Sequence, residues 1–238
     1  MKTYALVGSR LSHSFSASYF SEKFRNNSID AQYLNWEIDN LNGFRTSILN
    51  QGFAGLNVTI PHKQSVIQHL DELTTEAKLV GAVNCVKIIK SRFIGHNTDV
   101  FGFEKSLSNS MTSPPNAALV FGNGGGAMAV RFVLSKLNIP YRAVSRNGEL
   151  NYDNISFSDI EKSELLINCT PLGMYPKINT HPEIPYDAVT NRHLGFDLVY
   201  NPEETEFLAK IKSKGGIIVN GLEMLKLQAE ESWAIWNS

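Results

Sequence analysis

The sequence is poor in cysteine, shows no excess of charge of either sign and contains no long hydrophobic run. Its 238 residues include 22 Lys plus Arg and 23 Asp plus Glu, for a formal net charge of −1. Because nucleic-acid and anionic-membrane surfaces show a basic excess, we expect neither partner. The two cysteines, Cys85 and Cys169, lie too far apart for a disulfide framework or a paired-cysteine metal site.

Other absences narrow the class further. The apolar run at residues 4–8 is too short for a signal peptide, and no stretch approaches the roughly 20 apolar residues of a membrane span. The six histidines show no metal-ligand spacing, so we expect no bound metal. With 42% hydrophobic and 19% charged residues the chain can bury a core, and we expect a globular protein of the cytoplasm.

Short apolar runs alternate with longer amphipathic segments, a pattern typical of an α/β protein. In the first half the pattern predicts strands at 4–7, 31–38 and 54–60, helices at 16–26, 41–50 and 63–70, and a hairpin over 82–96. In the second half it predicts strands at 117–121, 141–144, 165–168, 195–197 and 217–219, and helices at 127–137 and 222–236. The polar, proline-rich segment 111–116 between the halves is the best linker candidate.

A glycine-rich turn is the first motif with chemical meaning. Residues 122–127 read Gly-Asn-Gly-Gly-Gly-Ala, the G-x-G-x-x-A form, between a predicted strand and a predicted helix. Residues without bulky side chains let a pyrophosphate approach the helix N-terminus, where backbone N–H groups can bind it. We therefore favour a dinucleotide site over a purely structural turn.

The residues after the next strand bear on which dinucleotide binds. An NAD site places a carboxylate there to bind the ribose hydroxyls, whereas this sequence has Ser145 and Arg146. A guanidinium pairs with a 2′-phosphate, so NADP is favoured, with a solvated loop arginine as the alternative interpretation. The nearest acid, Glu149, is expected to point to solvent.

Two polar residues of the first half could carry acid–base chemistry. Lys63 follows Pro61, which suits the first turn of a helix, and a helix N-terminus favours the neutral amine. Such an amine exchanges protons more readily than a surface lysine, but the segment taken alone favours a solvated lysine. Asp99 precedes an apolar run and, taken alone, is best interpreted as a helix N-cap.

Ser14 and Ser16 stand at the start of the first predicted helix. They are either capping residues or part of a carboxylate or phosphate site, because helix N-termini attract anions. His13 between them is expected to be structural, and His62 is expected at a pocket edge or on the surface.

Taken together, eight segments that follow one another along the chain resemble the shikimate dehydrogenase family. They are 8–16 (GSRLSHSFS), 55–63 (GLNVTIPHK), 81–84 (GAVN), 97–99 (NTD), 122–127 (GNGGGA), 168–174 (NCTPLGM), 197–202 (DLVYNP) and 221–228 (GLEMLKLQ). Each segment is modest evidence by itself, but the ordered set covers nearly the whole chain and is specific.

The resemblance implies a two-domain α/β fold, with an N-terminal α/β substrate domain and a shortened Rossmann-type NADP-binding domain. The substrate domain is expected over 1–100 and 222–238, and the dinucleotide-binding domain over 101–221, with the ligands in the cleft between them. The implied activity is the NADP-dependent, reversible reduction of 3-dehydroshikimate to shikimate, on the route to chorismate and the aromatic amino acids. A monomer or a homodimer is expected.

The resemblance also assigns roles to individual residues. Lys63 and Asp99 are the implied catalytic pair. The implied substrate-binding residues are Ser14 and Ser16 for the carboxylate, and Thr59, Asn84, Tyr200 and Gln228 for the remaining polar groups. The implied cofactor-binding residues are Gly122, Asn123, Gly124, Gly125, Gly126, Ala127, Ser145, Arg146, Thr170, Leu172, Met174 and Gly221.

The sequence departs from the family pattern in three places. Val100 replaces a glycine after Asp99, which affects the shape of the loop more than its chemistry. Asn123 replaces an alanine in the glycine turn, and asparagine tolerates left-handed conformations better than most residues. The third departure is that only residues 148–167 remain where a helix, a strand and another helix normally fit, although a parallel crossover needs a dozen or more residues by itself.

This shortening predicts that the helix after the second strand of the dinucleotide domain is absent or reduced to a turn. We expect a poor third strand over 151–157 and a short helix over 158–164. The adenine side of the cofactor site should then be open, so that the preference for NADP is moderate and declines with ionic strength.

Three alternatives stay open. A quinate or quinate/shikimate dehydrogenase using NAD would have the same catalytic pair. A catalytically silent NADP-binding regulator would need neither Lys63 nor Asp99. A methylenetetrahydrofolate dehydrogenase-like enzyme shares the two-domain plan but gives no reason for Ser14 and Ser16.

Overall fold

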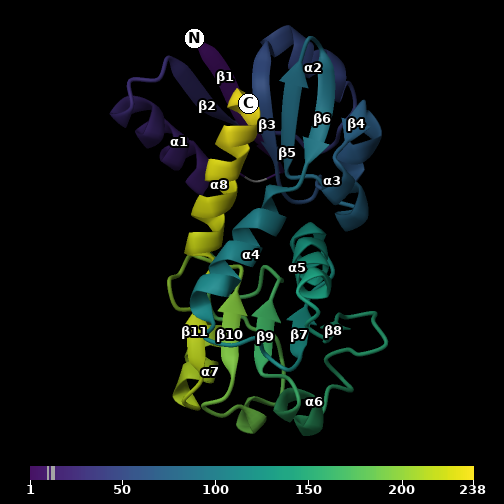
Figure 1. Ribbon diagram of the computed structural model, residues 1–238, viewed down its shortest axis with the longest axis vertical. Helices are drawn as coiled ribbons and strands as arrows, with labels where there is room; N and C mark the ends of the chain where they lie inside the picture. The colour runs from purple at the N-terminus through teal and green to yellow at the C-terminus, as the bar shows by residue number, and fades with distance from the viewer. Residues whose placement is uncertain (10, 12–13) are drawn as a thin grey trace. The chain divides into compact units, whose positions relative to one another are not determined.

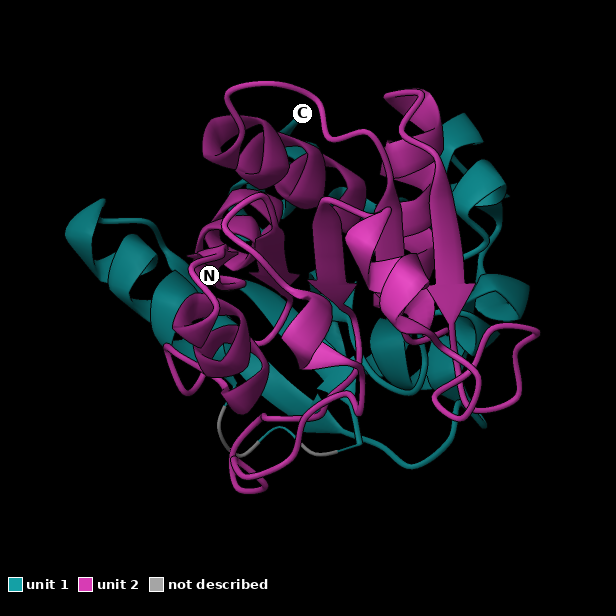
Figure 2. Ribbon diagram, turned by 90° about the horizontal axis from the view of Figure 1, so that it is seen from below, with its two compact units in different colours: residues 1–98, 229–238 teal, residues 99–228 magenta. Residues whose placement is uncertain are grey.

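The computed structural model describes residues 1–9, 11 and 14–238 (Figure 1). The chain divides into two compact units, coloured separately in Figure 2: unit 1 comprises 1–98 and 229–238, and unit 2 comprises 99–228. Both divisions fall in helices, α4 (Thr98–Ser110) and α8 (Leu222–Asn237). The sequence places the domain boundaries after residues 100 and 221, whereas the compact units divide after residues 98 and 228.

Unit 1 is built on a six-stranded mixed sheet with the strand order β2-β1-β3-β5-β6-β4. Its strands are β1 (Lys2–Gly8), β2 (Ala31–Glu37), β3 (Phe53–Val58), β4 (Glu72–Leu73), β5 (Cys85–Ile89) and β6 (Arg92–His96). β1 runs parallel to β2 and β3, while β5 is antiparallel to β3 and to β6. β5 and β6 form the hairpin that the sequence predicts, whereas β4 was not predicted.

Helices cover both faces of this sheet because side chains alternate along its strands. Tyr4 and Leu6 of β1 belong to a cluster that includes residues of α1 (Phe15–Asn26) and the last part of α8. Ala5 and Val7 belong to the opposite cluster, which includes residues of α2 (Phe44–Gln51) and α3 (Thr75–Val80). Figure 1 shows α1 and the end of α8 beside β1 to β3.

The helix predicted over 63–70 is wrong as an α-helix. Residues 61–64 form turns, and a short 3₁₀ helix, η1 (Ser65–His69), follows them. The physical reason lies in the hydrogen bonding, because the backbone carbonyl of Lys63 accepts from Val83 N (2.7 Å) on a neighbouring segment. The expectation that an α-helix N-terminus acts on Lys63 is therefore corrected.

Unit 2 is built on five parallel strands in the order β11-β10-β9-β7-β8. The strands are β7 (Ala118–Phe121), β8 (Tyr141–Val144), β9 (Leu165–Asn168), β10 (Leu194–Asp197) and β11 (Ile217–Val219). The helices between them are α5 (Gly125–Lys136), α6 (Phe157–Glu161), α7 (Glu206–Ser213) and the 3₁₀ helix η2 (Tyr186–Ala188). All five strands confirm the sequence-based prediction.

The two faces of the second sheet are also covered. Leu119, Phe121 and Leu166 belong to a cluster with residues of α6, η2 and α7. In α4, Phe103 meets Phe196 of β10 edge-on, with 5.1 Å between the ring centroids. The segment 111–116 joins α4 to β7 inside unit 2, so its interpretation as the linker between the two halves is wrong.

The shortened segment after β8 folds partly as predicted. The helix that normally follows the second strand is replaced by a loop, and a short helix forms as α6. The third strand expected over 151–157 is wrong: residues 152–154 form a turn, and Leu150 makes one isolated bridge to Val144. Asn151 Oδ1 accepts from the backbone N–H of Asp153 (2.9 Å), so side-chain hydrogen bonds favour the turn over an extended strand.

Asp197 is a buried carboxylate at the carboxyl end of β10. Its Oδ1 accepts from Asn168 Nδ2 (3.0 Å) and Val199 N (2.9 Å), and its Oδ2 accepts from Thr205 Oγ1 (2.6 Å). Asn168 Oδ1 in turn accepts from Thr170 N (3.0 Å) and Oγ1 (2.6 Å). This network therefore ties together the segments that follow β9 and β10.

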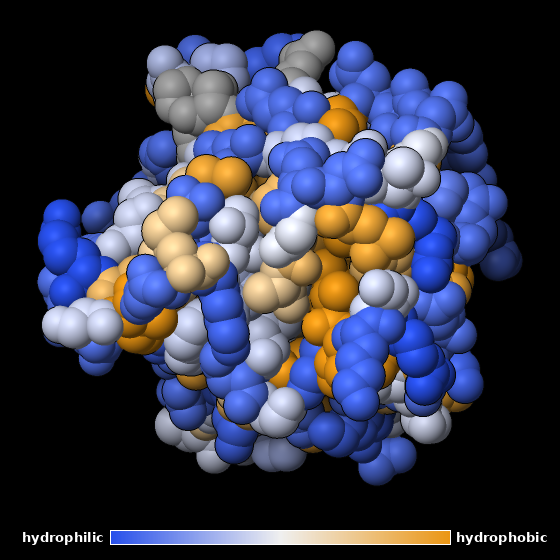
Figure 3. All heavy atoms as spheres, turned by 90° about the horizontal axis from the view of Figure 1, so that it is seen from above, coloured by the Kyte–Doolittle hydropathy of each residue, from blue (hydrophilic) through white to orange (hydrophobic). Residues whose placement is uncertain are grey.

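The face drawn in Figure 3 is largely hydrophilic, with hydrophobic side chains in small groups between polar ones. Among the described residues, no helix combines the length and the apolar character needed to cross a membrane.

The buried carboxyl of Asp197 should make stability depend on pH. Burial raises its pKa to about 6, against the opposing hydrogen bonds from Thr205, Val199 and Asn168. The pKa of this carboxyl is higher in the native protein than in the unfolded chain. Its contribution to the free energy of unfolding is therefore full below about pH 4 and is lost as the pH rises through about 6. Asp197→Asn should therefore gain stability relative to the parent between pH 4 and 7, by about 2–3 kcal/mol, measured by urea unfolding at each pH.

Asp187→Asn provides the matched control. A hydrogen bond from Lys214 lowers the pKa of Asp187, so this exposed variant should lose stability relative to the parent as the pH rises, the opposite sign. Parallel pH curves for Asp197→Asn and the parent would contradict the prediction.

Candidate active site

The glycine turn is shaped to receive a phosphate group. Gly122 has φ +109°, a conformation that residues with a side chain rarely adopt. Gly124 is the N-cap of α5, and a Cβ built there meets nothing within 4 Å, so a bulky neighbour has room to approach its backbone. The first N–H groups of α5 lack acceptors within their own helix, as at every helix N-terminus. Residues 122–127 therefore fit the pyrophosphate of a dinucleotide.

The turn after β9 lies against this glycine loop. A Cβ on Gly122 would come within 3.1 Å of Thr170 Cγ2, which places Thr170 directly beside it. Thr170 Oγ1 accepts from Leu172 N (3.2 Å), and Gly173 N donates to Thr180 Oγ1 (2.9 Å), so the turn is held at several points. Met174 at its end is exposed.

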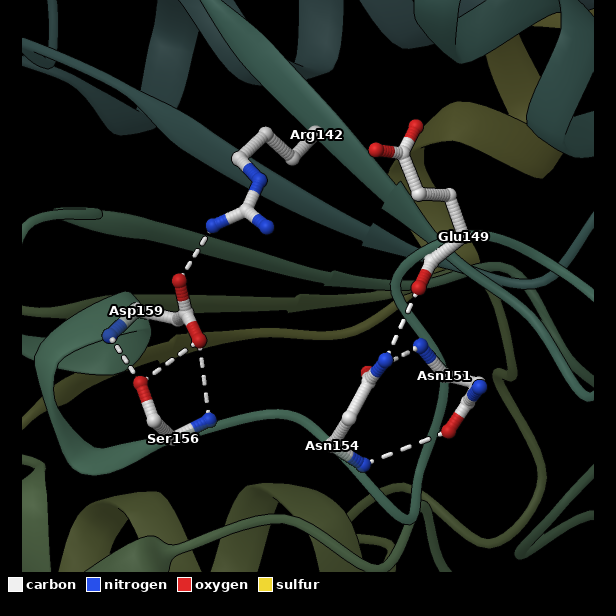
Figure 4. Close-up of polar contacts among 6 residues, drawn as sticks. All are labelled: Arg142, Glu149, Asn151, Asn154, Ser156 and Asp159. Atoms are coloured by element: carbon white, nitrogen blue, oxygen red, sulfur yellow. Dashed lines mark hydrogen bonds and ion pairs between the residues drawn. The ribbon is translucent and has the colours of Figure 1, made fainter.

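The loop after β8 carries the residues predicted to select the cofactor. Ser145 is half-buried and Arg146 is exposed, and Ser145 O accepts from Gly148 N (3.1 Å). A Cβ on Gly148 would lie 2.7 Å from Ser145 Oγ and 3.0 Å from the backbone oxygen of Leu150, so a side chain there would crowd the loop. Glu149 is exposed, and Figure 4 shows its carboxylate pointing away from the rest of the loop.

Gly221 immediately precedes α8 and is packed closely against the segment after β10. A Cβ on Gly221 would lie 2.2 Å from the backbone oxygen of Leu198, so no side chain fits. The requirement for glycine at this position is therefore explained by packing within unit 2.

The two serines predicted to bind an anion lie at the start of α1. Ser14 is the N-cap residue, but its hydroxyl makes no capping hydrogen bond. Ser14 Oγ is buried and has no hydrogen-bond partner among the described residues. A buried hydroxyl without a hydrogen-bond partner is costly, so this atom fits a ligand that would accept a hydrogen bond from it. His13, expected to be structural, and Ser12 of the same motif lie outside the described residues.

Ser16 belongs to a chain of buried polar side chains that the sequence did not reveal. Its hydroxyl is hydrogen-bonded to Tyr33, whose own hydroxyl donates to Asn57 Oδ1 (2.8 Å). Asn57 Nδ2 donates to Ser232 Oγ (2.8 Å), which lies 3.1 Å from Thr98 Oγ1. Burial raises the pKa of Tyr33, which keeps this phenol protonated as a donor.

This series of hydrogen-bonded side chains ends at Asn84, one of the predicted substrate-binding residues. Asn84 Oδ1 accepts from Thr98 N (2.6 Å), and Asn84 Nδ2 donates to Thr98 Oγ1 (3.0 Å). The backbone oxygen of Asn84 accepts from Val58 N (2.8 Å), next to Thr59 at the end of β3. Ser16, Thr59 and Asn84 are thus fixed around the same group of strand ends in unit 1. From the sequence, only Asn57 within the motif 55–63 pointed to this network. Tyr33 and Ser232 lie far from Asn57 in the sequence, so no local pattern links them to it.

The remaining predicted residues are distributed over both units. Lys63 is half-buried in the turn after β3 of unit 1. Asp99 is buried in the first turn of α4, immediately after Thr98, and opens unit 2. Tyr200, half-buried after β10, and Gln228, buried in α8, also belong to unit 2.

Several other polar residues are poor candidates for chemistry. Burial raises the pKa of the Cys85 thiol to about 12 and also raises that of Cys169, so neither is an activated nucleophile. His62 is buried, with Nε2 2.9 Å from Ile38 O, and lines a pocket of about 430 Å³ with Asp39, Asn40 and His69. In the described part of the chain, no three His, Cys, Asp or Glu side chains gather as metal ligands.

Comparisons with known proteins identify the family of the chain. Residues 6–86 match the family model described as the shikimate dehydrogenase substrate binding domain. A shikimate dehydrogenase (NADP(+)) from Clostridium beijerinckii is 37% identical, over 99% of this chain and 92% of that protein.

Solved structures extend the similarity to the fold. Shikimate dehydrogenase from Aquifex aeolicus superposes with a TM-score of 0.91 at 30% identity, covering 100% of this chain and 92% of the other. The enzyme from Thermus thermophilus, solved in complex with NADP(H) and shikimate, gives a TM-score of 0.89 at 28% identity, with 99% and 93% covered. The similarity thus spans both units, and the chain belongs to the family of NADP-dependent shikimate dehydrogenases.

Proposed function

We propose that this chain catalyses the reversible, NADP-dependent reduction of 3-dehydroshikimate to shikimate. The observation that carries the proposal is the similarity, over nearly its whole length, to enzymes named for that activity. The presence of both Lys63 and Asp99 supports turnover rather than silent cofactor binding, because a regulator needs neither residue. Both cysteines are free thiols, which supports a reducing compartment such as the cytoplasm.

We assign the proton transfer of this reaction to the pair Lys63 and Asp99. When bound, the cofactor would supply the redox chemistry, giving a hydride to the ring carbon that bears the reacting oxygen as NADPH or taking one from it as NADP+. Lys63 Nζ donates a proton to that oxygen when the ketone is reduced and takes it back when the alcohol is oxidised. The Asp99 carboxylate orients and polarises the amine.

We assign the binding of the substrate carboxylate to Ser14 and Ser16. Ser14 Oγ is the buried hydroxyl without a protein partner among the described residues, and α1 adds a favourable dipole at its N-terminus. Thr59, Asn84, Tyr200 and Gln228 are assigned to the hydroxyl and carbonyl groups of the ring.

The cofactor is assigned to unit 2. Residues 122–127 would bind the pyrophosphate, Ser145 and Arg146 the 2′-phosphate, and the turn of Thr170, Leu172 and Met174 would border the nicotinamide. Gly221 supports this site by letting α8 start close to the segment after β10.

The experiment that tests the function is a steady-state assay at the absorbance of the reduced nicotinamide. Shikimate and quinate are each offered with NADP and with NAD. The proposal expects the highest kcat/KM for shikimate with NADP. Preference for quinate with NAD would establish the dehydrogenase alternative, and cofactor binding without turnover would establish the silent regulator.

Lys63→Ala should lower turnover far more than it weakens substrate binding. General acid–base groups contribute about 10²–10⁴-fold, so kcat should fall by at least about a hundredfold. Asp99→Asn should act similarly, and the double variant should lose less than the product of the single effects, because the two residues act together. The exposed Lys78→Ala in the same unit is the matched control and should keep full activity. A Lys63→Ala enzyme with half the original kcat would rule out the role.

Ser14→Ala should raise KM for shikimate without lowering the stability of the free protein. The lost hydrogen bond to a carboxylate is worth about 1.5–3 kcal/mol, or roughly a 10–150-fold rise in KM. The folded chain should lose nothing, since the removed hydroxyl has no hydrogen-bond partner among the described residues. Ser18→Ala in the same helix, where the hydroxyl donates to Phe15 O (2.9 Å), should leave KM unchanged. An equal loss for a substrate analogue without the carboxylate would contradict the assignment.

Arg146→Ala should weaken NADP binding and leave NAD nearly unaffected. The exposed guanidinium faces salt and water, so we expect a loss on the order of tenfold at low ionic strength that shrinks as salt is added. Titration of both cofactors at two salt concentrations measures it. Arg142→Ala is the matched control, because Arg142 pairs with Asp159 of α6 (Figure 4). Equal losses for NADP and NAD would show that Arg146 supports the loop instead.

A further inference from the structure

The shortened loop between β8 and α6 is folded by its own hydrogen bonds. Ser145 N donates to Leu150 O (3.2 Å), and Asn154 Nδ2 donates to the backbone oxygen of Glu149 (2.8 Å). Asn151 N donates to Asn154 Oδ1 (2.8 Å), and Asn151 Oδ1 accepts from Asn154 N (3.2 Å). Figure 4 shows these two asparagines facing each other across the turn. The loop therefore presents a defined surface.

The only aromatic residue between β8 and α6 is Tyr152, within this turn. Its neighbours Leu150 and Ile155 are buried in the core cluster, whereas Tyr152 is half-buried and packs against the edge of that cluster. Its ring is therefore anchored on one side and keeps part of its surface accessible.

Tyr152 lies close to the carboxyl end of β8, because Leu150, two residues before it, bridges to Val144, the last residue of that strand. The charge of Arg146, which follows β8, acts on its phenol. Burial raises the pKa of Tyr152, and Arg146 opposes that shift, so the phenol is neutral at physiological pH. The bridge and this interaction both place Tyr152 by the carboxyl end of β8.

In a dinucleotide fold the adenosine ribose is bound at the end of the second strand, which here is β8. We propose that the ring of Tyr152 forms a wall of the adenosine site and packs against the adenine base, where a third strand and its helix would otherwise stand. This inference rests on the proposed function, because it requires NADP as the cofactor. Aromatic rings stack on any base, so this contact raises affinity without discriminating between NADP and NAD.

The test separates the two halves of the cofactor. Binding of adenosine 2′,5′-bisphosphate and of reduced nicotinamide mononucleotide is measured by calorimetry on the full chain. Tyr152→Leu keeps apolar bulk against the core but removes the aromatic face, and should weaken the adenosine fragment about tenfold. Tyr152→Phe keeps the ring and should bind like the parent. Neither variant should change the affinity for the nicotinamide fragment.

Tyr141→Leu is the matched control, because Tyr141 is a half-buried tyrosine at the opposite, amino end of β8. It should leave both affinities unchanged. Unaltered binding of the adenosine fragment to Tyr152→Leu, or an equal loss for both fragments, would overturn the inference while leaving the proposed function intact. A parent chain that binds neither NADP nor the adenosine fragment would overturn the proposed function, and the inference with it.

Discussion

Polar side chains buried at the ends of the strands must find hydrogen-bond partners, and much of the site follows from how they do so. In unit 1, Asn57 and Asn84 meet this requirement through Ser232 and Thr98, which fixes the ends of β3, β5 and β6 relative to one another. In unit 2, Asp197 meets it through Asn168 and Thr205. Each sheet thereby ends in a rigid polar frame.

These two frames differ in which polar groups they leave accessible to a ligand. In unit 1, Ser16 and Asn84 are engaged in the frame, while Ser14 Oγ has no partner among the described residues. In unit 2, Thr170 is held by Asn168 against Gly122, so the glycine turn and the turn after β9 are fixed as one surface. A fixed surface needs little rearrangement on binding, so little conformational entropy of the protein's own loops is lost when a cofactor binds.

The sequence predicted the elements whose signal is local. Buried strands such as β7 and β9 are continuous apolar runs, and the glycine turn has a fixed spacing, so both were found. The residues 63–70 were misread because Lys63 O accepts from Val83, a partner that no local pattern encodes. The segment 151–157 was misread because the side chains of Asn151 and Asn154 satisfy the backbone in a turn. Likewise, Tyr33 and Ser232 come together with Asn57 only through the tertiary fold.

The loss of a third strand also leaves β8 as the last strand of its sheet, which creates a hazard of another kind. An unpaired strand offers free N–H and C=O groups to other chains and can seed aggregation. Here β8 has only four residues, and its exposed Arg142 is paired with Asp159. The loop that folds back to bridge Leu150 to Val144 blocks the carboxyl end of the strand. The same short loop thus also limits the pairing of β8 with a strand of another chain.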